Sequence, residues 1–172
     1  MQHLDVCDDP TEFRQMVACM MYTFRDHKGL LPGRSESLRE LFTNFNEVEY
    51  VVCYENRTMY KYTFEIMCQD LAKEGNWTRL PTHLILMFIS FLFNLKFVIV
   101  NEKSTWNADI TAWEPELKKD EAPIEVPELI TVHLGNVDET HYVPLQVLPD
   151  GYDQPEIPSY GNAYRKFMRW GI

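Results

Sequence analysis

The side chains best suited to covalent or metal chemistry in this 172-residue chain are its four cysteines, at positions 7, 19, 53 and 68. They form no Cys-x-x-Cys pair and no Cys/His spacing of the zinc-binding kind, so we expect neither a metal nor a cofactor. Two aspartates follow Cys7 directly, and their carboxylates would raise the pKa of its thiol and suppress the thiolate. Cys19 and Cys68 fall in apolar helical patterns, and we expect both in the core.

The elements that must position these side chains are predicted from hydrophobic periodicity. The pattern predicts helices over 11–25, 38–45, 60–73 and 82–93, and strands over 96–100, 129–134 and 141–147. Asp9 is a suitable N-cap for the first helix, with Pro10 at its first position, and Ser35 or Ser37 can cap the second. Residues 114–128 read as an exposed loop, 135–140 as a turn, 149–161 as an irregular tail and 163–170 as a short closing helix. The predicted fold class is therefore α/β (α+β), a small mixed sheet flanked by helices.

One apolar stretch, Leu84 to Val100, could be mistaken for a membrane span. Asn94 and Lys96 interrupt it, whereas a spanning helix needs about 20 predominantly apolar residues. We therefore interpret the stretch as a buried helix, a tight turn and a buried strand.

Composition indicates a packed globular protein with one domain. Hydrophobic residues make up 45% of the chain and aromatic residues 13%, enough for a substantial core. The net charge of −10 argues against a nucleic-acid partner, which would require clustered Lys and Arg. It suits a partner with a basic face.

Two segments together resemble the active site of ovarian-tumour (OTU) family deubiquitinases. Residues 8–14 are similar to the family's usual Asp-Gly-Asp/Asn-Cys-Leu-Phe-Arg, with Asp8, Phe13 and Arg14 matching the Asp, Phe and Arg. The segment Thr-His-Tyr-Val-Pro-Leu at 140–145 is similar to the second half. Between them lie, in the family's order, Leu38-Arg39, a Tyr/Met-rich stretch ending in a Trp turn, and the apolar helix, Asn turn and strand. The resemblance covers roughly residues 8–147.

The resemblance implies a role for each matching position. Thr11 stands where the family has its nucleophilic Cys, at the start of the first helix, and His141 stands at the general base. Asp8 could orient the imidazole from the opposite side. Trp77 and Tyr142 fall where family members contact their substrate.

The departures from the family pattern matter more than the matches. A threonine hydroxyl is a far poorer nucleophile than a thiolate, so we interpret Thr11 as a residue that caps or packs the first helical turn. Pro10 and Glu12 also differ from the usual motif. Val143 replaces a polar residue that often orients the histidine, which favours His141 as a remnant or as a hydrogen-bonded residue at the start of a strand.

We expect a single OTU-like domain over residues 1–172, with a core at about 8–147 and a tail at 148–172. Its expected function is that of a dead or very weak cytoplasmic deubiquitinase that binds ubiquitin, a ubiquitin-like protein or another protein. Three alternatives remain open. The first is an active cysteine protease using Cys7 with His141 after a register shift, the second is a non-catalytic adaptor or RNA-associated OTU module, and the third is an unrelated α/β domain.

Overall fold

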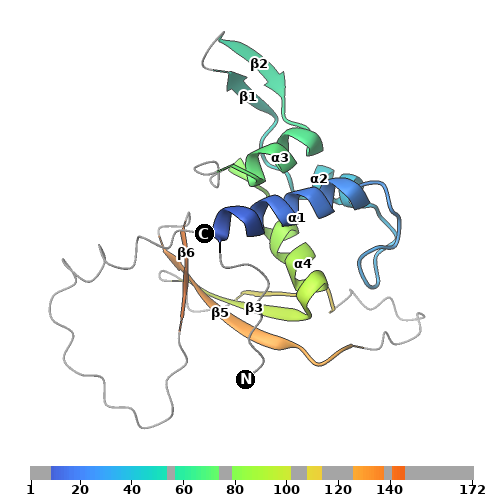
Figure 1. Cartoon of the computed structure of the whole chain (residues 1–172), viewed down its shortest axis with the longest axis vertical. Coiled ribbons are helices and arrows are strands. Elements are labelled where there is room, and N and C mark those ends of the chain that lie inside the picture. Colours follow the sequence, from blue (N-terminus) through green and yellow to red (C-terminus); the bar gives the residue numbers. More distant parts are fainter. Residues whose placement is uncertain are drawn as a thin grey trace, which may run out of the picture.

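The computed structural model describes residues 9–53, 57–73, 79–101, 108–113, 126–137 and 141–145. Its elements run in the order α1 (Pro10–Phe24), α2 (Leu38–Phe45), β1 (Tyr50–Cys53), β2 (Thr58–Lys61), α3 (Phe64–Leu71), α4 (Thr82–Phe93), β3 (Leu95–Asn101), β4 (Ala108–Ile110), β5 (Ile130–Val137) and β6 (His141–Pro144). The fold is mixed α/β, as the sequence predicted (Figure 1).

A four-stranded mixed sheet and helix α4 form the centre of the fold. The strand order is β4-β3-β5-β6, with β3 and β5 parallel and the two outer pairings antiparallel. Helix α4 packs against β3 and β4 on one side and against α2 on the other. In Figure 1 it lies between the sheet and the three other helices. Because residues Leu84 to Phe88 and Ser90 of α4 are buried, the helix can be apolar around most of its circumference.

The predicted ends of three helices are confirmed. The side chain of Asp9 accepts a hydrogen bond from the Thr11 amide at 2.8 Å, and Pro10 opens α1. Ser37 and Glu40 form a capping box at the start of α2. Asn94 ends α4 in the left-handed conformation, with φ 52° and ψ 53°, a conformation that asparagine tolerates better than most residues. The Asn turn then leads straight into β3.

The interpretation of Leu84 to Val100 as a buried helix, a turn and a strand is also confirmed. Helix α4 has 12 residues, or about 18 Å of helix, against the ~30 Å of a bilayer's hydrocarbon core. Within the part of the chain that the structure describes, no helix is long and apolar enough to cross a membrane.

Ser90 is a polar residue buried completely within this apolar helix. Its hydroxyl bonds to the Leu95 carbonyl, lies 3.1 Å from the Thr111 hydroxyl, and accepts the Ala112 amide at 3.0 Å. These bonds satisfy a hydroxyl that would otherwise be costly to bury. They also join α4 to the backbone that follows β4.

The third predicted helix, 60–73, is wrong at its start. Tyr60 and Lys61 belong to β2, and α3 begins only at Phe64, where the Thr63 side chain accepts the Ile66 amide at 3.4 Å. The preceding residues form a hairpin, β1–β2, that the sequence analysis did not predict. The apolar face of α3 is as predicted, since Phe64, Met67, Cys68 and Leu71 are all buried.

The predicted strands are present, but their limits differ. Strand β5 continues to Val137, so part of the predicted turn at 135–140 is strand, because β5 pairs with β3 as far as Asn101↔Asn136. The short strand β4 was not predicted. The predictions for residues 114–125, 138–140 and 146–172 fall outside the described residues.

Candidate functional site

The first turn of α1 holds Thr11, the residue at the predicted nucleophile position. The Asp9 carboxylate accepts the Thr11 amide, and the Phe13 amide donates to the Asp9 carbonyl at 3.0 Å. Thr11 itself is half-buried. Thr11 therefore lies at a well-formed helix start, which agrees with its interpretation as a residue of the first turn.

The electrostatics of this helix start do not favour an anion. Free backbone N–H groups and the helix dipole normally make an N-terminus attractive to a thiolate or an oxyanion. Here the Asp9 carboxylate already accepts the hydrogen bond of the Thr11 amide, and Glu12 adds a second carboxylate to the first turn. A nucleophile at position 11 would therefore sit beside negative charge.

The two motif residues Phe13 and Arg14 anchor the helix. The ring of Phe13 packs against that of Phe93, with centroids 5.9 Å apart, and so joins the start of α1 to the end of α4. Arg14 is only 8% exposed, which is uncommon for arginine. Both residues thus have a role in packing that does not depend on catalysis.

Of the other predicted site residues, two lie in strand β6 and the rest lie outside the described residues. His141 is the first residue of β6, where it pairs with Val137, and Tyr142 follows it. Figure 1 draws the start of α1 and strand β6 on the same side of the molecule. Asp8, Cys7 and Trp77 are not among the described residues, nor are the side chains of His141 and Tyr142.

A shallow groove of about 510 Å³ lies between α1 and α3, which pack against each other. It is lined by Gln15, Ala18, Cys19, Tyr22, Glu65, Cys68, Gln69 and Ala72. The prediction that Cys19 is a core residue is wrong, because its side chain is exposed. The buried face of α1 passes through Val17, Ala18 and Met21, and Cys19 falls just beyond its edge.

Cys68, on the opposite wall of the groove, is buried as predicted. Burial, together with the nearby charge of Glu65, raises the pKa of its thiol to about 12. Since the thiolate is the reactive species, Cys68 is chemically inert near neutral pH.

We expect iodoacetamide at about pH 8 to alkylate Cys19 and to leave Cys68 unmodified in the folded protein. Tryptic peptides 15–25 and 62–73 separate the two thiols, so mass spectrometry reads each one directly. In guanidinium chloride both should react at similar rates. Equal rates in the folded protein would contradict the burial of Cys68.

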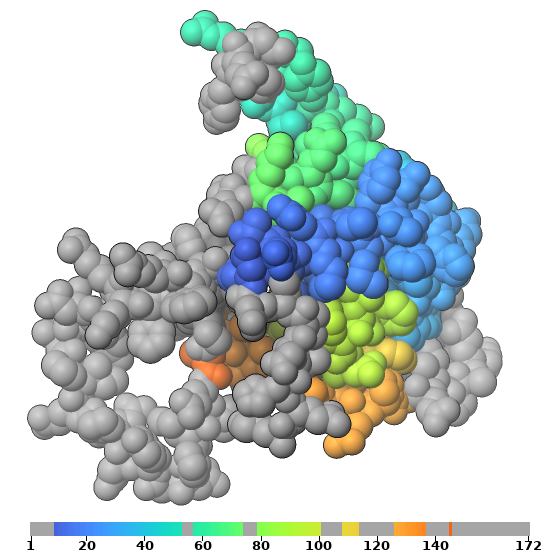
Figure 2. All heavy atoms as spheres, in the orientation of Figure 1, coloured from blue at the N-terminus to red at the C-terminus, as the bar shows by residue number. Residues whose placement is uncertain are grey.

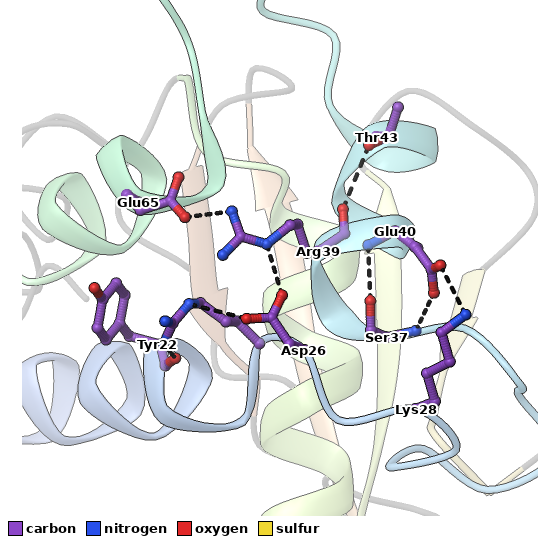
Figure 3. Close-up of polar contacts among 9 residues, drawn as sticks. Tyr22, Asp26, Lys28, Ser37, Arg39, Glu40, Thr43 and Glu65 are labelled. Atoms are coloured by element: carbon purple, nitrogen blue, oxygen red, sulfur yellow. Dashed lines mark hydrogen bonds and ion pairs between the residues drawn. The ribbon is translucent and has the colours of Figure 1, made fainter.

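Arg39, matched by resemblance to the family's second helix, has a structural role. Its guanidinium donates to Asp26 at 2.8 Å and to Glu65, joining the end of α1, the start of α2 and the start of α3 (Figure 3). The hydrogen bond with Asp26 raises the pKa of Arg39, and the same bond lowers the pKa of Asp26. Beside it, Lys28 contacts Glu40 of the capping box at 3.2 Å.

Comparisons with protein-family models, with curated proteins and with solved structures found no significant match for this chain.

Proposed function

We propose that this protein is an OTU-like pseudoenzyme, a domain of the deubiquitinase type that has lost all or nearly all hydrolase activity and binds ubiquitin or another protein. The observation that carries the proposal is the start of α1. Thr11 lies in the first turn, where the resemblance requires a nucleophile, and its amide donates a hydrogen bond to the Asp9 carboxylate.

The order of the elements supports the same proposal. A capped first helix, a second helix that opens with Leu38-Arg39, an apolar helix with an Asn turn, and a hairpin whose returning strand begins with His141 all follow in the expected order. Binding needs only complementary surface, whereas cleavage needs a nucleophile and a base within about 3 Å of each other. A site without its thiol can therefore still hold a ligand.

The charge of the chain fits a protein partner better than a nucleic acid, and the proposal places both proteins in the cytoplasm. A net charge of −10 attracts a basic-rimmed protein surface, such as the resemblance leads us to expect for ubiquitin, and repels phosphate. In this proposal Trp77 and Tyr142 contact the bound partner.

The test is labelling with ubiquitin that carries a cysteine-reactive group at its C-terminus, read by intact mass. We expect no adduct on the unmodified protein and a slowly formed adduct on Thr11→Cys, because bound ubiquitin would hold the reactive group beside position 11 although the Asp9 and Glu12 carboxylates suppress the thiolate. The matched control is Glu12→Cys, which places a thiol in the same helical turn on an exposed side chain and should stay unlabelled. Adding His141→Ala to Thr11→Cys should slow the labelling by at least about 100-fold if His141 acts as base.

Each other outcome contradicts the pseudoenzyme or narrows its alternatives. An adduct on the unmodified protein that disappears in Cys7→Ala would establish the active cysteine protease and overturn the pseudoenzyme. Labelling of Glu12→Cys as fast as Thr11→Cys would show that no site geometry is present. If no variant is labelled, a titration of isotope-labelled ubiquitin separates a non-catalytic adaptor, which shifts its resonances, from an unrelated α/β domain, which does not.

A further inference from the structure

The β1–β2 hairpin projects from the helices as a two-stranded sheet of its own (Figures 1 and 2). Every described residue of β2 is exposed, and the exposed fractions of Tyr50, Val52 and Met59 are 50%, 46% and 63%. An isolated two-stranded hairpin is at best marginally stable in water, and a wider sheet is more favourable. The hairpin therefore has both the shape and the apolar surface of a segment that gains stability by adding strands.

The backbone of β1 has hydrogen-bonding groups that face its outer edge. The Tyr62 amide donates to the Glu49 carbonyl at 2.9 Å, so this pair faces inward across the hairpin. In an antiparallel ladder the bonded pairs alternate, which makes Val51↔Tyr60 the next inward pair. The N–H and C=O groups of Tyr50 and Val52 consequently point away from β2.

Charge distinguishes the two edges of the hairpin. Strand β1 reads Tyr-Val-Val-Cys and carries no charge, whereas Arg57 precedes β2 and Lys61 ends it. Lysine at an edge is a common device against strand pairing. If two β2 strands paired antiparallel about Met59, Arg57 would face Lys61 of the second copy, and like charges would repel. In a β1 pairing about Val51, Glu49, which precedes β1, would face the uncharged Cys53 of the second copy, so two β1 strands meet no such repulsion.

We propose that β1 is a dimer interface, at which a second copy of this chain pairs antiparallel to form a continuous sheet in the order β2-β1-β1-β2. With the two-fold axis at Val51, Tyr50 of one copy lies opposite Val52 of the other, in both directions. In this register the outward N–H and C=O groups of Tyr50 and Val52 form the hydrogen bonds between the two copies. Because the axis is perpendicular to the sheet, Tyr50 and Val52 of both copies lie on the same face and form one continuous apolar strip along the β1–β1 seam.

This interface does not depend on the proposed function. The hairpin lies at the opposite end of the helical layer from β6 in Figure 1, so a dimer can form whether or not the start of α1 binds ubiquitin.

The test is sedimentation of the full chain at protein concentrations up to about 1 mM, which covers weak dimers. We expect a concentration-dependent dimer that Val52→Lys weakens at least about tenfold in Kd, since the new charge enters the interface twice. Met59→Lys is the matched control: Met59 lies directly opposite Val52 on the same face of the hairpin, but on β2, and the dimer should persist. Circular dichroism checks that both variants fold.

The register gives a rescue experiment. Tyr50→Glu alone should also weaken the dimer, whereas its mixture with Val52→Lys should form a heterodimer more readily than either variant self-associates, because the introduced carboxylate of one variant then faces the introduced ammonium of the other. A monomer at every concentration would overturn the proposal. Equal weakening of the dimer by Val52→Lys and Met59→Lys, or a mixture that stays monomeric, would show that the β1 edge is not the dimer interface. The hairpin would then bind a different protein, or the dimer would use another surface of this chain.

Discussion

Replacing Arg79 with methionine should lower the free energy of unfolding by about 3 kcal/mol, because it leaves the carboxylate of Asp70 buried without its cation. The side chain of Asp70 is only 6% exposed, and Arg79 holds it with two parallel bonds, Nε to Oδ2 at 2.6 Å and a terminal nitrogen to Oδ1 at 2.7 Å. Such a fork-to-carboxylate pair is the strongest geometry for an ion pair. Arg79 is one-third exposed, which places the loss at the lower end of the range for a broken buried pair.

The carboxylate of Asp70 also has an effect on Tyr62. Burial of the phenol, together with the charge of Asp70, raises the pKa of Tyr62 well above its ordinary value. The ion pair thus lies near Tyr62, the residue that follows β2. Breaking it should loosen the connection between α3 and the residues that lead into α4.

Equilibrium denaturation of the variants measures this effect. Lys28→Met is the matched control, since the Lys28–Glu40 pair is well exposed and should change the free energy of unfolding far less than Arg79→Met. The double variant Asp70→Leu with Arg79→Met should recover much of the loss, because no unpaired charge then remains buried. Equal losses for Arg79→Met and Lys28→Met would contradict this account.

Local sequence signals predicted the parts of the fold that local interactions determine. Asp9 before Pro10, and Ser37 three residues before Glu40, define the starts of α1 and α2 through hydrogen bonds within a few residues. The run that follows Pro81 is long and apolar enough to identify α4, and Asn94 marks its end. Each of these signals is complete within a short segment of chain.

The elements that were missed depend on pairing. Strand β4 has three residues and exists because it pairs with β3, which periodicity within so short a segment cannot predict. The hairpin was missed because Tyr60 and Lys61 extend the pattern of α3 backwards, although Thr63 caps the helix after them. For the candidate site, the sequence placed Thr11 at a helix start and His141 at a strand start. The relation between those two elements is set by packing across the whole chain.

The second large effect is expected from Phe88→Ala, which should lower the free energy of unfolding by about 3–5 kcal/mol. Phe88 has no exposed surface and lies in the middle of α4. A typical domain has a total stability of about 5–15 kcal/mol, so this single change should remove a large fraction of it. Thermal and urea denaturation both report the loss.

Phe91→Ala is the control on the same helix. Phe91 is half-buried, lies 6.5 Å from Phe88 by ring centroids, and packs on Trp113 at 6.0 Å. Truncating Phe91 leaves a space that is open to solvent, so the loss in the free energy of unfolding should be clearly smaller than for Phe88→Ala. Phe88→Leu, which keeps most of the buried volume, should cost less than half of Phe88→Ala.

The difference between the two phenylalanines tests the architecture itself. The cost of a cavity depends on how far the surrounding atoms can collapse into it, and α4 is held by β3 and β4 on one side and by α2 on the other. The bonds of Ser90 to Leu95 and Ala112 restrain the helix further, so the space left by Phe88 cannot close easily. If Phe88→Ala cost no more than Phe91→Ala, α4 would have to be a mobile element at the margin of the core. The packing of Phe13 on Phe93 at the end of α4 would then give the start of α1 no fixed position.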